Sequence, residues 1–352
     1  MIKLYKYRPL TDFLFKELYY SELYFASYSE LNDPLDLSVR IDFRPENERE
    51  IISLIVFLVK VSLLYEDEIN DNNQRIIDFV NNKELTREFC GQLYDSVIKL
   101  NRDFLPYEVI ENHIAALSKE YNIQFKISEL DNEIQSLAKV FFENSYTTCF
   151  SEIPSDFLMW SHYASKHSGI CLEFSSAHEE RFPYIFRSKR RPDKEKYLEN
   201  SSQWDSKEHI YWDRIRKIKY QDKPPSINFY EFLPVFENKN DIDLIKLSKS
   251  KCHGFAHELE RVFSIKTTPW EYEKEWRAIE INFDKIKEPE ERIRHYPIEI
   301  LTGIYFGIRT PEPVKVRIYS LFKSKNADVK YFDAQLTNER DLSFNEWEYH
   351  EE

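Results

Sequence analysis

The chain contains very little glycine: there are five glycines among 352 residues, where a soluble protein of this length ordinarily has about 25. No two of them are closer than four positions, so the signatures GxGxxG, the P-loop and GxSxG are absent. Those motifs need glycine where the backbone adopts a positive φ or touches a phosphate. The sequence therefore argues against a Rossmann dehydrogenase, a P-loop NTPase, a protein kinase and an α/β-hydrolase.

Cysteine and long apolar runs are also scarce, and the chain has no net positive charge. The four cysteines form no CxxC pair, which favours reduced thiols and a cytoplasmic location over a disulfide framework. The most apolar run, residues 51–64, contains Lys60 and is shorter than the ~20 residues of a membrane span. We therefore expect a buried helix there, no signal peptide in MIKLYKYRPL and no membrane partner. The formal charge of −13 opposes tight non-specific binding to nucleic acid or anionic lipid.

Aromatic residues are abundant, and the hydrophobic pattern divides the chain into regions. Residues 46–146 have almost continuous helical periodicity, which predicts a helical insertion with helices at 47–66, 73–81, 84–104, 107–121 and 129–145. Residues 1–45 and 147–340 show mixed periodicity and are predicted to form one core domain, followed by an acidic tail at 341–352. We expect no internal repeat.

The mixed regions alternate between short strands and helices. Strands are predicted at 2–7, 23–27, 147–150, 169–174, 271–283, 299–306 and 328–332. Helices are predicted at 11–19, 155–167, 205–216, 240–262 and 311–323. Because strand segments far apart in the sequence are separated by helices, we expect an α+β fold whose mixed or antiparallel central sheet contains the N-terminal strand.

A basic island interrupts the acidic chain. Residues 187–223 have twelve Lys or Arg and seven Asp or Glu, a local charge of +5, which leaves −18 elsewhere. Such a segment is most simply a solvated loop and helix. The functional alternative is a surface that contacts a phosphate, or a nucleic-acid or protein acceptor.

The sharpest local signal is the segment 270–283, WEYEKEWRAIEINF. In a strand, Glu273, Glu275 and Arg277 would share one face, with the two carboxylates roughly 6.5–7 Å apart. Such a row can hold sugar hydroxyls, stabilise a positively charged transition state, or supply an acid–base pair, since a like-charged neighbour raises one carboxyl pKa. The alternative is an exposed edge-strand face with a simple Glu–Arg pair.

Two further segments carry candidate binding residues. In the predicted helix 155–167, Trp160, Tyr163 and His167 share one face and His162 lies beside them, although buried or capping histidines are the plainer interpretation. Glu173 lies within an apolar strand, so it either faces outward or has specific partners.

In the opening segment, Lys6 and Arg8 share a strand face and could clamp a phosphate. Asn32 and Asp33 precede Pro34 and could simply form a turn, whereas Asp36 is less easily explained in this way. His253 and His257 have a spacing that permits a shared metal, but no second ligand pair accompanies them. We therefore expect no metal site.

Several blocks, taken together, resemble a bacterial family described as domain of unknown function 2971 (DUF2971). In chain order they are Leu4-Tyr-Lys-Tyr-Arg, Leu23-Tyr-Phe-Ala-Ser, Leu31-Asn-Asp-Pro-Leu-Asp, Cys149-Phe-Ser-Glu, Met159-Trp-Ser-His-Tyr-Ala, Gly169-Ile-Cys-Leu-Glu-Phe, Trp270-Glu-Tyr-Glu-Lys-Glu-Trp-Arg and Ile304-Tyr-Phe-Gly. The blocks span residues 4–307, and the helical insertion and the basic island lie outside them. The resemblance by itself implies no activity.

The order of the opening elements is also similar to ADP-ribosyltransferase folds. That resemblance implies a cationic residue on the first strand, here Lys6 or Arg8, then a Ser or Tyr, here Ser27 or Tyr28, and a late catalytic glutamate, here Glu273 or Glu275. It implies NAD as a substrate with no tightly bound cofactor, aromatic stacking by Tyr5, Tyr7 or Tyr28, and pairing of Arg8 with the pyrophosphate. The chain departs from the pattern in having no histidine on the first strand.

Three functional hypotheses follow. The first is an NAD-consuming ADP-ribosyltransferase or glycohydrolase, for example a toxin or phage-defence effector acting inside the cell. The second is a nucleic-acid-directed effector or nuclease that uses the basic island and acidic residues with a divalent ion. The third is a non-catalytic sensor or interaction module in which the aromatic residues only pack. The first needs Arg8, Tyr28, Glu273 and Glu275 to converge on one cleft.

Overall fold

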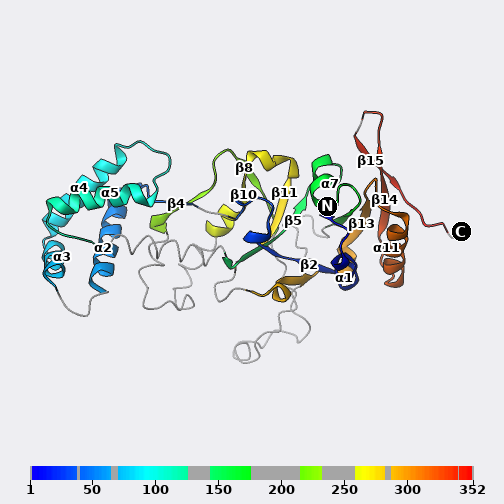
Figure 1. Ribbon diagram of the computed structural model, residues 1–352, viewed down its shortest axis with the longest axis horizontal. Coiled ribbons are helices and arrows are strands. Elements are labelled where there is room, and N and C mark those ends of the chain that lie inside the picture. Colours follow the sequence, from blue (N-terminus) through cyan, green and yellow to red (C-terminus); the bar gives the residue numbers. More distant parts are fainter. Residues whose placement is uncertain are drawn as a thin grey trace, which may run out of the picture.

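The fold is an open mixed β-sheet covered by helices, with a group of helices extending from one end (Figure 1). The computed structural model describes residues 2–37, 40–64, 70–125, 143–175, 215–231, 258–281, 287–339 and 341–350. Within these residues, the predicted α+β class is confirmed.

In the part of the chain that the structure describes, the central sheet has nine strands, and the N-terminal strand lies in its middle. The order is β15-β14-β13-β6-β1-β5-β11-β7, with β3 paired to β5. All neighbours are antiparallel except β13 and β14. The strands are β1 (Lys3–Arg8), β3 (Ala26–Ser27), β5 (Ser145–Ser151), β6 (Ile170–Ser175), β7 (Ile215–Lys217), β11 (Glu275–Ile281), β13 (Leu301–Phe306), β14 (Lys330–Leu336) and β15 (Leu342–Glu346).

Three short strand pairs lie beside this sheet. They are β2 (Glu22–Tyr24) with β12 (Ile293–His295), β4 (Arg40–Asp42) with β9 (Ser226–Asn228), and β8 (Lys219–Gln221) with β10 (Ile265–Thr267). The first pair is antiparallel and the other two are parallel.

Alternation along β1 determines which helices cover which face of the sheet. Leu4 belongs to a buried cluster with residues of α1 (Asp12–Tyr20) and α11 (Glu312–Ser324). Tyr5 and Tyr7 belong to another cluster with Trp160 of α7 (Phe157–Tyr163). The period-two pattern therefore places α7 on the opposite face from α1 and α11.

The helical insertion contains α2 (Glu48–Leu64), α3 (Asp71–Asn81), α4 (Lys83–Ile98) and α5 (Tyr107–Glu120). Four of the predicted helices therefore form, and Asn70 and Asn82 cap two of them by accepting backbone N–H groups. The fifth, 129–145, lies almost wholly outside the described residues, and its last residue begins β5. The helices share one buried cluster with Phe229 and Leu259, so this part of the core is completed by residues from the second half of the chain.

Two predictions in the α+β region were wrong in their extent. The predicted strand 271–283 begins only at Glu275, because Pro269 starts a 3₁₀ helix, η4 (Thr268–Glu273), that occupies the preceding residues. The predicted helix 155–167 ends at Tyr163, and a turn with left-handed residues follows. Of the predicted helices 205–216 and 240–262, only 215–216 and 258–262 are described; the former are strand and the latter helical.

Gly169 is required for space where β1, β6 and the turn after α7 meet. A Cβ at this position would lie 2.3 Å from the carbonyl oxygen of Arg8, a backbone atom. We expect Gly169→Ala to lower the free energy of unfolding by about 1–3 kcal/mol, measured by chemical denaturation. The control is Gly91→Ala within α4, where the nearest atom is 3.7 Å away; it should stabilise by about 0.5–1 kcal/mol. Equal effects of the two substitutions would contradict this packing.

Candidate functional site

The central sheet splits between β1 and β5. β1 pairs along its whole length with β6, but with β5 only at Tyr5 and Ser151. On the same edge of β5, the next described pairing is with β3, at Thr147 and Tyr146. The edge between these contacts borders a cavity of about 440 Å³, a volume typical of small-molecule sites.

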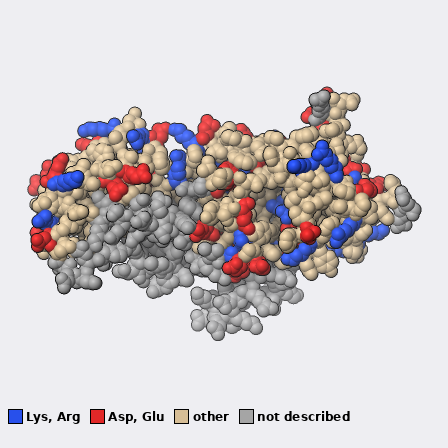
Figure 2. Space-filling model, viewed as in Figure 1, with Lys and Arg blue, Asp and Glu red and all other residues tan. Residues whose placement is uncertain are grey.

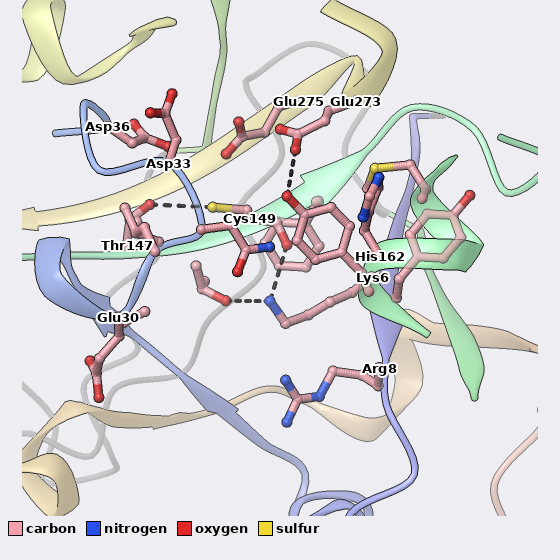
Figure 3. A pocket seen from close by; sticks show the side chains of 18 of the residues that line it. Lys6, Arg8, Glu30, Asp33, Asp36, Thr147, Cys149, His162, Glu273 and Glu275 are labelled. Carbon is pink, nitrogen blue, oxygen red and sulfur yellow. Dashed lines mark hydrogen bonds between the residues drawn. The ribbon is translucent and has the colours of Figure 1, made fainter. Parts of the chain in front are cut away.

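Residues far apart in the sequence meet in this cavity (Figure 3). Its lining comes from β1 and the residue after it, the segment 24–36, β5, α7, β10, the end of η4 and the start of β11. The lining residues are Tyr5, Lys6, Tyr7, Arg8, Pro9, Tyr24, Ala26, Glu30, Leu31, Asn32, Asp33, Asp36, Thr147, Thr148, Cys149, Phe150, Met159, His162, Tyr163, Lys266, Glu273 and Glu275.

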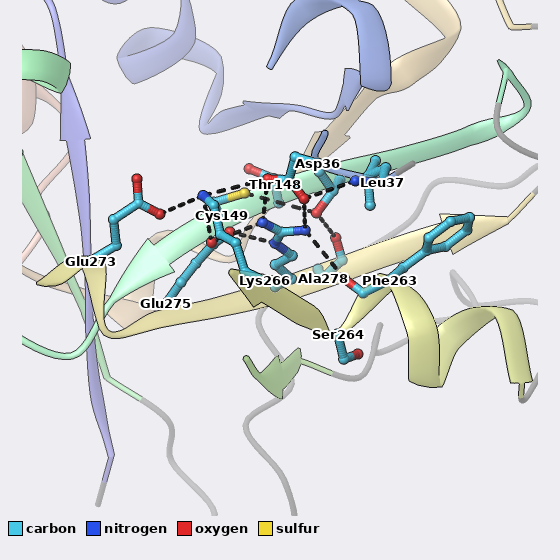
Figure 4. Close-up of polar contacts among 12 residues, drawn as sticks. Asp36, Leu37, Thr148, Cys149, Phe263, Ser264, Lys266, Glu273, Glu275 and Ala278 are labelled. Carbon is cyan, nitrogen blue, oxygen red and sulfur yellow. Dashed lines mark hydrogen bonds and ion pairs between the residues drawn. The ribbon is translucent and has the colours of Figure 1, made fainter. Parts of the chain in front are cut away.

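One end of the cavity is a buried cluster of three carboxylates and two cations (Figure 4). Arg277, with no exposed surface, donates to Asp36 over 2.6 and 2.5 Å and to Glu275 over 2.5 and 2.9 Å. Lys266 Nζ lies 2.7 Å from Glu273, 3.3 Å from Glu275 and 3.4 Å from Asp36. With all groups ionised, the cluster has one negative charge in excess.

The two glutamates of this cluster have pKa values that are shifted in opposite directions. Burial, and then the charge of Glu275, raise the pKa of Glu273 to about 7. Burial would also raise the pKa of Glu275, but Arg277 and Lys266 outweigh it and lower that pKa to about 2. Glu275 is therefore a fixed anion, whereas Glu273 exchanges a proton near neutral pH.

Local backbone geometry directs both glutamates into the cavity. Lys274, between them, has a φ of 44°, a left-handed conformation that is uncommon for a residue other than glycine. Glu273 and Glu275 are both only 3% exposed. The Tyr163 hydroxyl donates to Glu273 over 2.6 Å, and the Tyr220 hydroxyl accepts the Glu275 N–H over 2.8 Å. Tyr163 of α7 thus holds the carboxylate of Glu273, and Tyr220 of β8 holds the backbone of Glu275.

The other end of the cavity is formed by the cationic side chains of β1. Lys6 Nζ donates to Thr148 Oγ1 over 2.8 Å and to the Cys149 carbonyl over 3.0 Å, and so bridges the split in the sheet. Burial, and then the charge of Arg8, lower the pKa of Lys6 to about 8. Arg8 forms an ion pair with Glu17 of α1.

Most of the residues singled out in the sequence border the cavity. They are Tyr5, Lys6, Tyr7, Arg8, Asn32, Asp33, Asp36, His162, Tyr163, Glu273 and Glu275. The segment 32–36 also forms the expected turn, because Asp33 accepts the N–H of Leu35. The NAD hypothesis required four residues to converge on one cleft. Arg8, Glu273 and Glu275 border the cavity, whereas Tyr28 does not.

Five predicted site residues do not line the cavity. Trp160 is fully buried against Tyr7, and its N–H donates to the Pro154 carbonyl. His167 lies beyond the end of α7 and packs on Phe157. The reasons differ: Trp160 fills the core under the sheet, and the early end of α7 turns His167 away.

The other three also have structural roles. Ser27 donates its hydroxyl to Glu30, which caps a short 3₁₀ helix, η1 (Tyr28–Glu30). Tyr28 packs against the core of the helical insertion. Arg277 does not line the cavity but lies behind the carboxylates, where it forms ion pairs with Asp36 and Glu275. It is therefore a positioning residue for the acidic end.

Sequence reasoning missed the central cation, Lys266. It lies in β10, a strand of three residues, and all three of its carboxylate partners are brought to it by the fold. Thr148 and Cys149 were missed for a related reason, since they matter only where the sheet splits. The one available signal was an isolated lysine shortly before the acidic segment 270–283.

Glu173, the acidic residue of the apolar strand, has specific partners rather than facing outward. Tyr305 and Thr302 donate to its carboxylate over 2.8 and 2.7 Å, and Tyr5 and Lys3 do so over 3.2 Å. Its burial is offset by these donors, which lower its pKa. Because Tyr5 also borders the cavity, this network fixes one wall of the site.

The described part of the predicted basic island forms ion pairs with acidic side chains. Figure 2 shows acidic and basic side chains mixed over the face in view. Of the basic island 187–223, only residues 215–223 are described, and there Arg216, Lys217 and Lys223 form ion pairs with acidic side chains.

His253 and His257 lie outside the described residues. In the described part of the chain, no helix is long and apolar enough to span a membrane.

The candidate site is therefore a cavity with one acidic end and one cationic end. It lies where the central sheet of this α+β protein splits. Residues 159–278 match the sequence model of a family described as a protein of unknown function (DUF2971). This confirms the predicted family resemblance over about a third of the chain, including Tyr163, Lys266 and both glutamates. No curated protein and no solved structure matches the chain.

Proposed function

We propose that the cavity binds NAD and that the protein cleaves its nicotinamide–ribose bond, as an ADP-ribosyltransferase or an NAD glycohydrolase would. One observation carries the proposal. Glu273 and Glu275 are buried and border the same cavity as Lys6 and Arg8 of the first strand. The site thus offers carboxylates to a sugar and a cation to its phosphate within one enclosure.

The acidic end suits the charge that develops in this reaction. When the bond to nicotinamide lengthens, the ribose becomes an oxocarbenium ion, and a fixed negative field stabilises it. The cluster of Asp36, Glu273, Glu275, Lys266 and Arg277 has one excess negative charge once Glu273 ionises. Because the cluster is held by its own ion pairs, it needs little reorganisation as the ribose becomes positive.

Proton transfer falls to Glu273. Nicotinamide leaves NAD as a neutral base when it takes the bonding electrons, so its departure needs no acid. The incoming hydroxyl or water must lose a proton, and a carboxylate whose pKa is about 7 can accept it near neutral pH. Glu273 Oε1 and Oε2 contact Tyr163 and Lys266 respectively, which fixes the orientation of the base.

The aromatic lining provides surfaces for the nicotinamide ring. Tyr5, Tyr7, Phe150 and Tyr163 border the cavity, and the hydroxyls of Tyr5 and Tyr7 are held by Glu173 and by the Ile153 carbonyl. Rings fixed in this way can stack on a planar cation at little cost in conformational entropy.

The test is incubation with NAD labelled separately in its nicotinamide and adenylate halves. We expect free nicotinamide to be released. Adenylate label on protein or nucleic acid from a cell lysate would identify a transferase, and free ADP-ribose would identify a glycohydrolase. If NAD remains intact both with and without lysate, the proposal is wrong.

A further inference from the structure

We propose that Lys6 alone is the anion-binding group of this cavity, and that it holds a phosphate group. The proposal deepens the proposed function by naming the contact for the phosphate of the substrate. It depends only on the ligand having a phosphate and a sugar, whichever bond is cleaved.

Arg8, the residue that resemblance would favour for a phosphate, already has an anionic partner. Its guanidinium lies against both carboxylate oxygens of Glu17, and both side chains are largely buried. To bind a phosphate, Arg8 would have to leave Glu17 as an unpaired carboxylate at the edge of the site, which is costly.

Lys6 is in the opposite situation. Its ammonium donates to two neutral oxygens, those of Thr148 and Cys149, and a lysine has three N–H donors. Among the described residues, no carboxylate forms an ion pair with it. A partly buried cation without a counter-ion loses part of its hydration uncompensated, and burial lowers the pKa of Lys6. An anion that enters the cavity would remove this cost.

The remainder of the lining limits where an anion can lie. Of the residues described, five with carboxylates border the cavity: Glu30, Asp33, Asp36, Glu273 and Glu275. In Figure 3, the side chain of Lys6 lies between Arg8 on one side and Glu273 and Glu275 on the other. A simple dianion would meet repulsion from the acidic end, whereas a sugar phosphate places hydroxyls there and its phosphate at Lys6. The cavity is therefore suited to a ligand with two chemically different ends.

The experiment measures binding of ribose 5-phosphate, ribose and inorganic pyrophosphate by calorimetry, in the full chain and without turnover. We expect ribose 5-phosphate to bind tightest. Lys6→Met keeps an unbranched side chain but removes the ammonium, whose Nζ lies 5.2 Å from the centroid of the Phe150 ring. It should weaken ribose 5-phosphate binding by about tenfold to a hundredfold. Its effect on ribose binding should be small.

Two matched substitutions complete the design. Arg8→Gln should weaken ribose 5-phosphate binding by less than about threefold, since Arg8 is already paired. Lys217→Met, at a half-exposed lysine that pairs with Glu152 outside the cavity, should have no effect. Circular dichroism would check that Lys6→Met is folded, as expected when a partly buried charge without an ion-pair partner is removed.

The outcomes separate this site from the proposed reaction. The Lys6 proposal is wrong if ribose 5-phosphate does not bind, if folded Lys6→Met binds it as the unchanged protein does, or if Arg8→Gln weakens it as much. If binding depends on Lys6 but NAD stays intact, only the proposed reaction fails. If nicotinamide is released equally well by Lys6→Met, and sugar phosphate binding is unchanged, only the anion site fails.

Discussion

Replacing Glu273 by glutamine is expected to lower the rate of nicotinamide release by about 100- to 10,000-fold, the range for removing an acid–base group or a major electrostatic contact. Glutamine keeps the size of the side chain and its hydrogen bond from Tyr163. It removes the proton acceptor and the excess negative charge of the cluster. The measurement is the initial rate of nicotinamide release at saturating NAD.

The matched control is Glu152→Gln. Glu152 is bonded to Lys217 and to the indole N–H of Trp276, next to the same strand but outside the cavity. Its substitution should leave the rate within about twofold of the unchanged protein, as expected for a surface ion pair. Equal rates for Glu273→Gln and Glu152→Gln would remove Glu273 from the mechanism.

The pH dependence of stability gives a readout of Glu273 that needs no substrate. Because its pKa is raised to about 7 in the fold, its protonated form contributes stability that is fully present below the unfolded value of about 4.3 and is lost as the pH rises through 7. Glu275 behaves oppositely: its contribution is present above about 4.3 and is lost as the pH falls towards 2. In Glu273→Gln, the decline in unfolding free energy between pH 4.5 and 7 should be smaller.

The sequence could predict those parts of the site that depend on local pattern. Alternation placed Lys6 and Arg8 on the first strand, and the acidic motif drew attention to Glu273 and Glu275. What it could not predict arises from pairings between distant segments. The cavity opens because the backbones of β1 and β5 pair only at Tyr5 and Ser151. Lys266 acquires its role only when Asp36 and both glutamates surround it.

The same limitation explains the errors. Trp160 and Tyr163 are three residues apart in one helix, yet one is buried in the core and the other borders the cavity. Helical periodicity predicts that the two residues share a face of the helix. It does not predict which part of that face packs in the core and which part borders a cavity. In the acidic motif, period-two alternation could not reveal that Pro269 begins a 3₁₀ helix before the strand.

Arg277→Met is expected to have the largest effect on stability, lowering the free energy of unfolding by about 3–5 kcal/mol. Arg277 makes bidentate contacts with both Asp36 and Glu275 and has no exposed surface. Its removal would leave Lys266 as the only cation for three buried carboxylates. The measurement is chemical denaturation at pH 7, and the loss should diminish at lower pH as Glu273 protonates.

A neighbouring arginine provides the control for this prediction. Arg216 lies directly across from Arg277 on β7 and pairs with Glu260, but both side chains are partly exposed. Arg216→Met should therefore cost less than about 1 kcal/mol. If Arg277→Met costs no more than this, the carboxylates are hydrated rather than enclosed. Adding Glu275→Gln to Arg277→Met should restore part of the lost stability, because it removes one of the uncompensated charges, and this coupling would show that the arginine holds the acidic end of the cavity together.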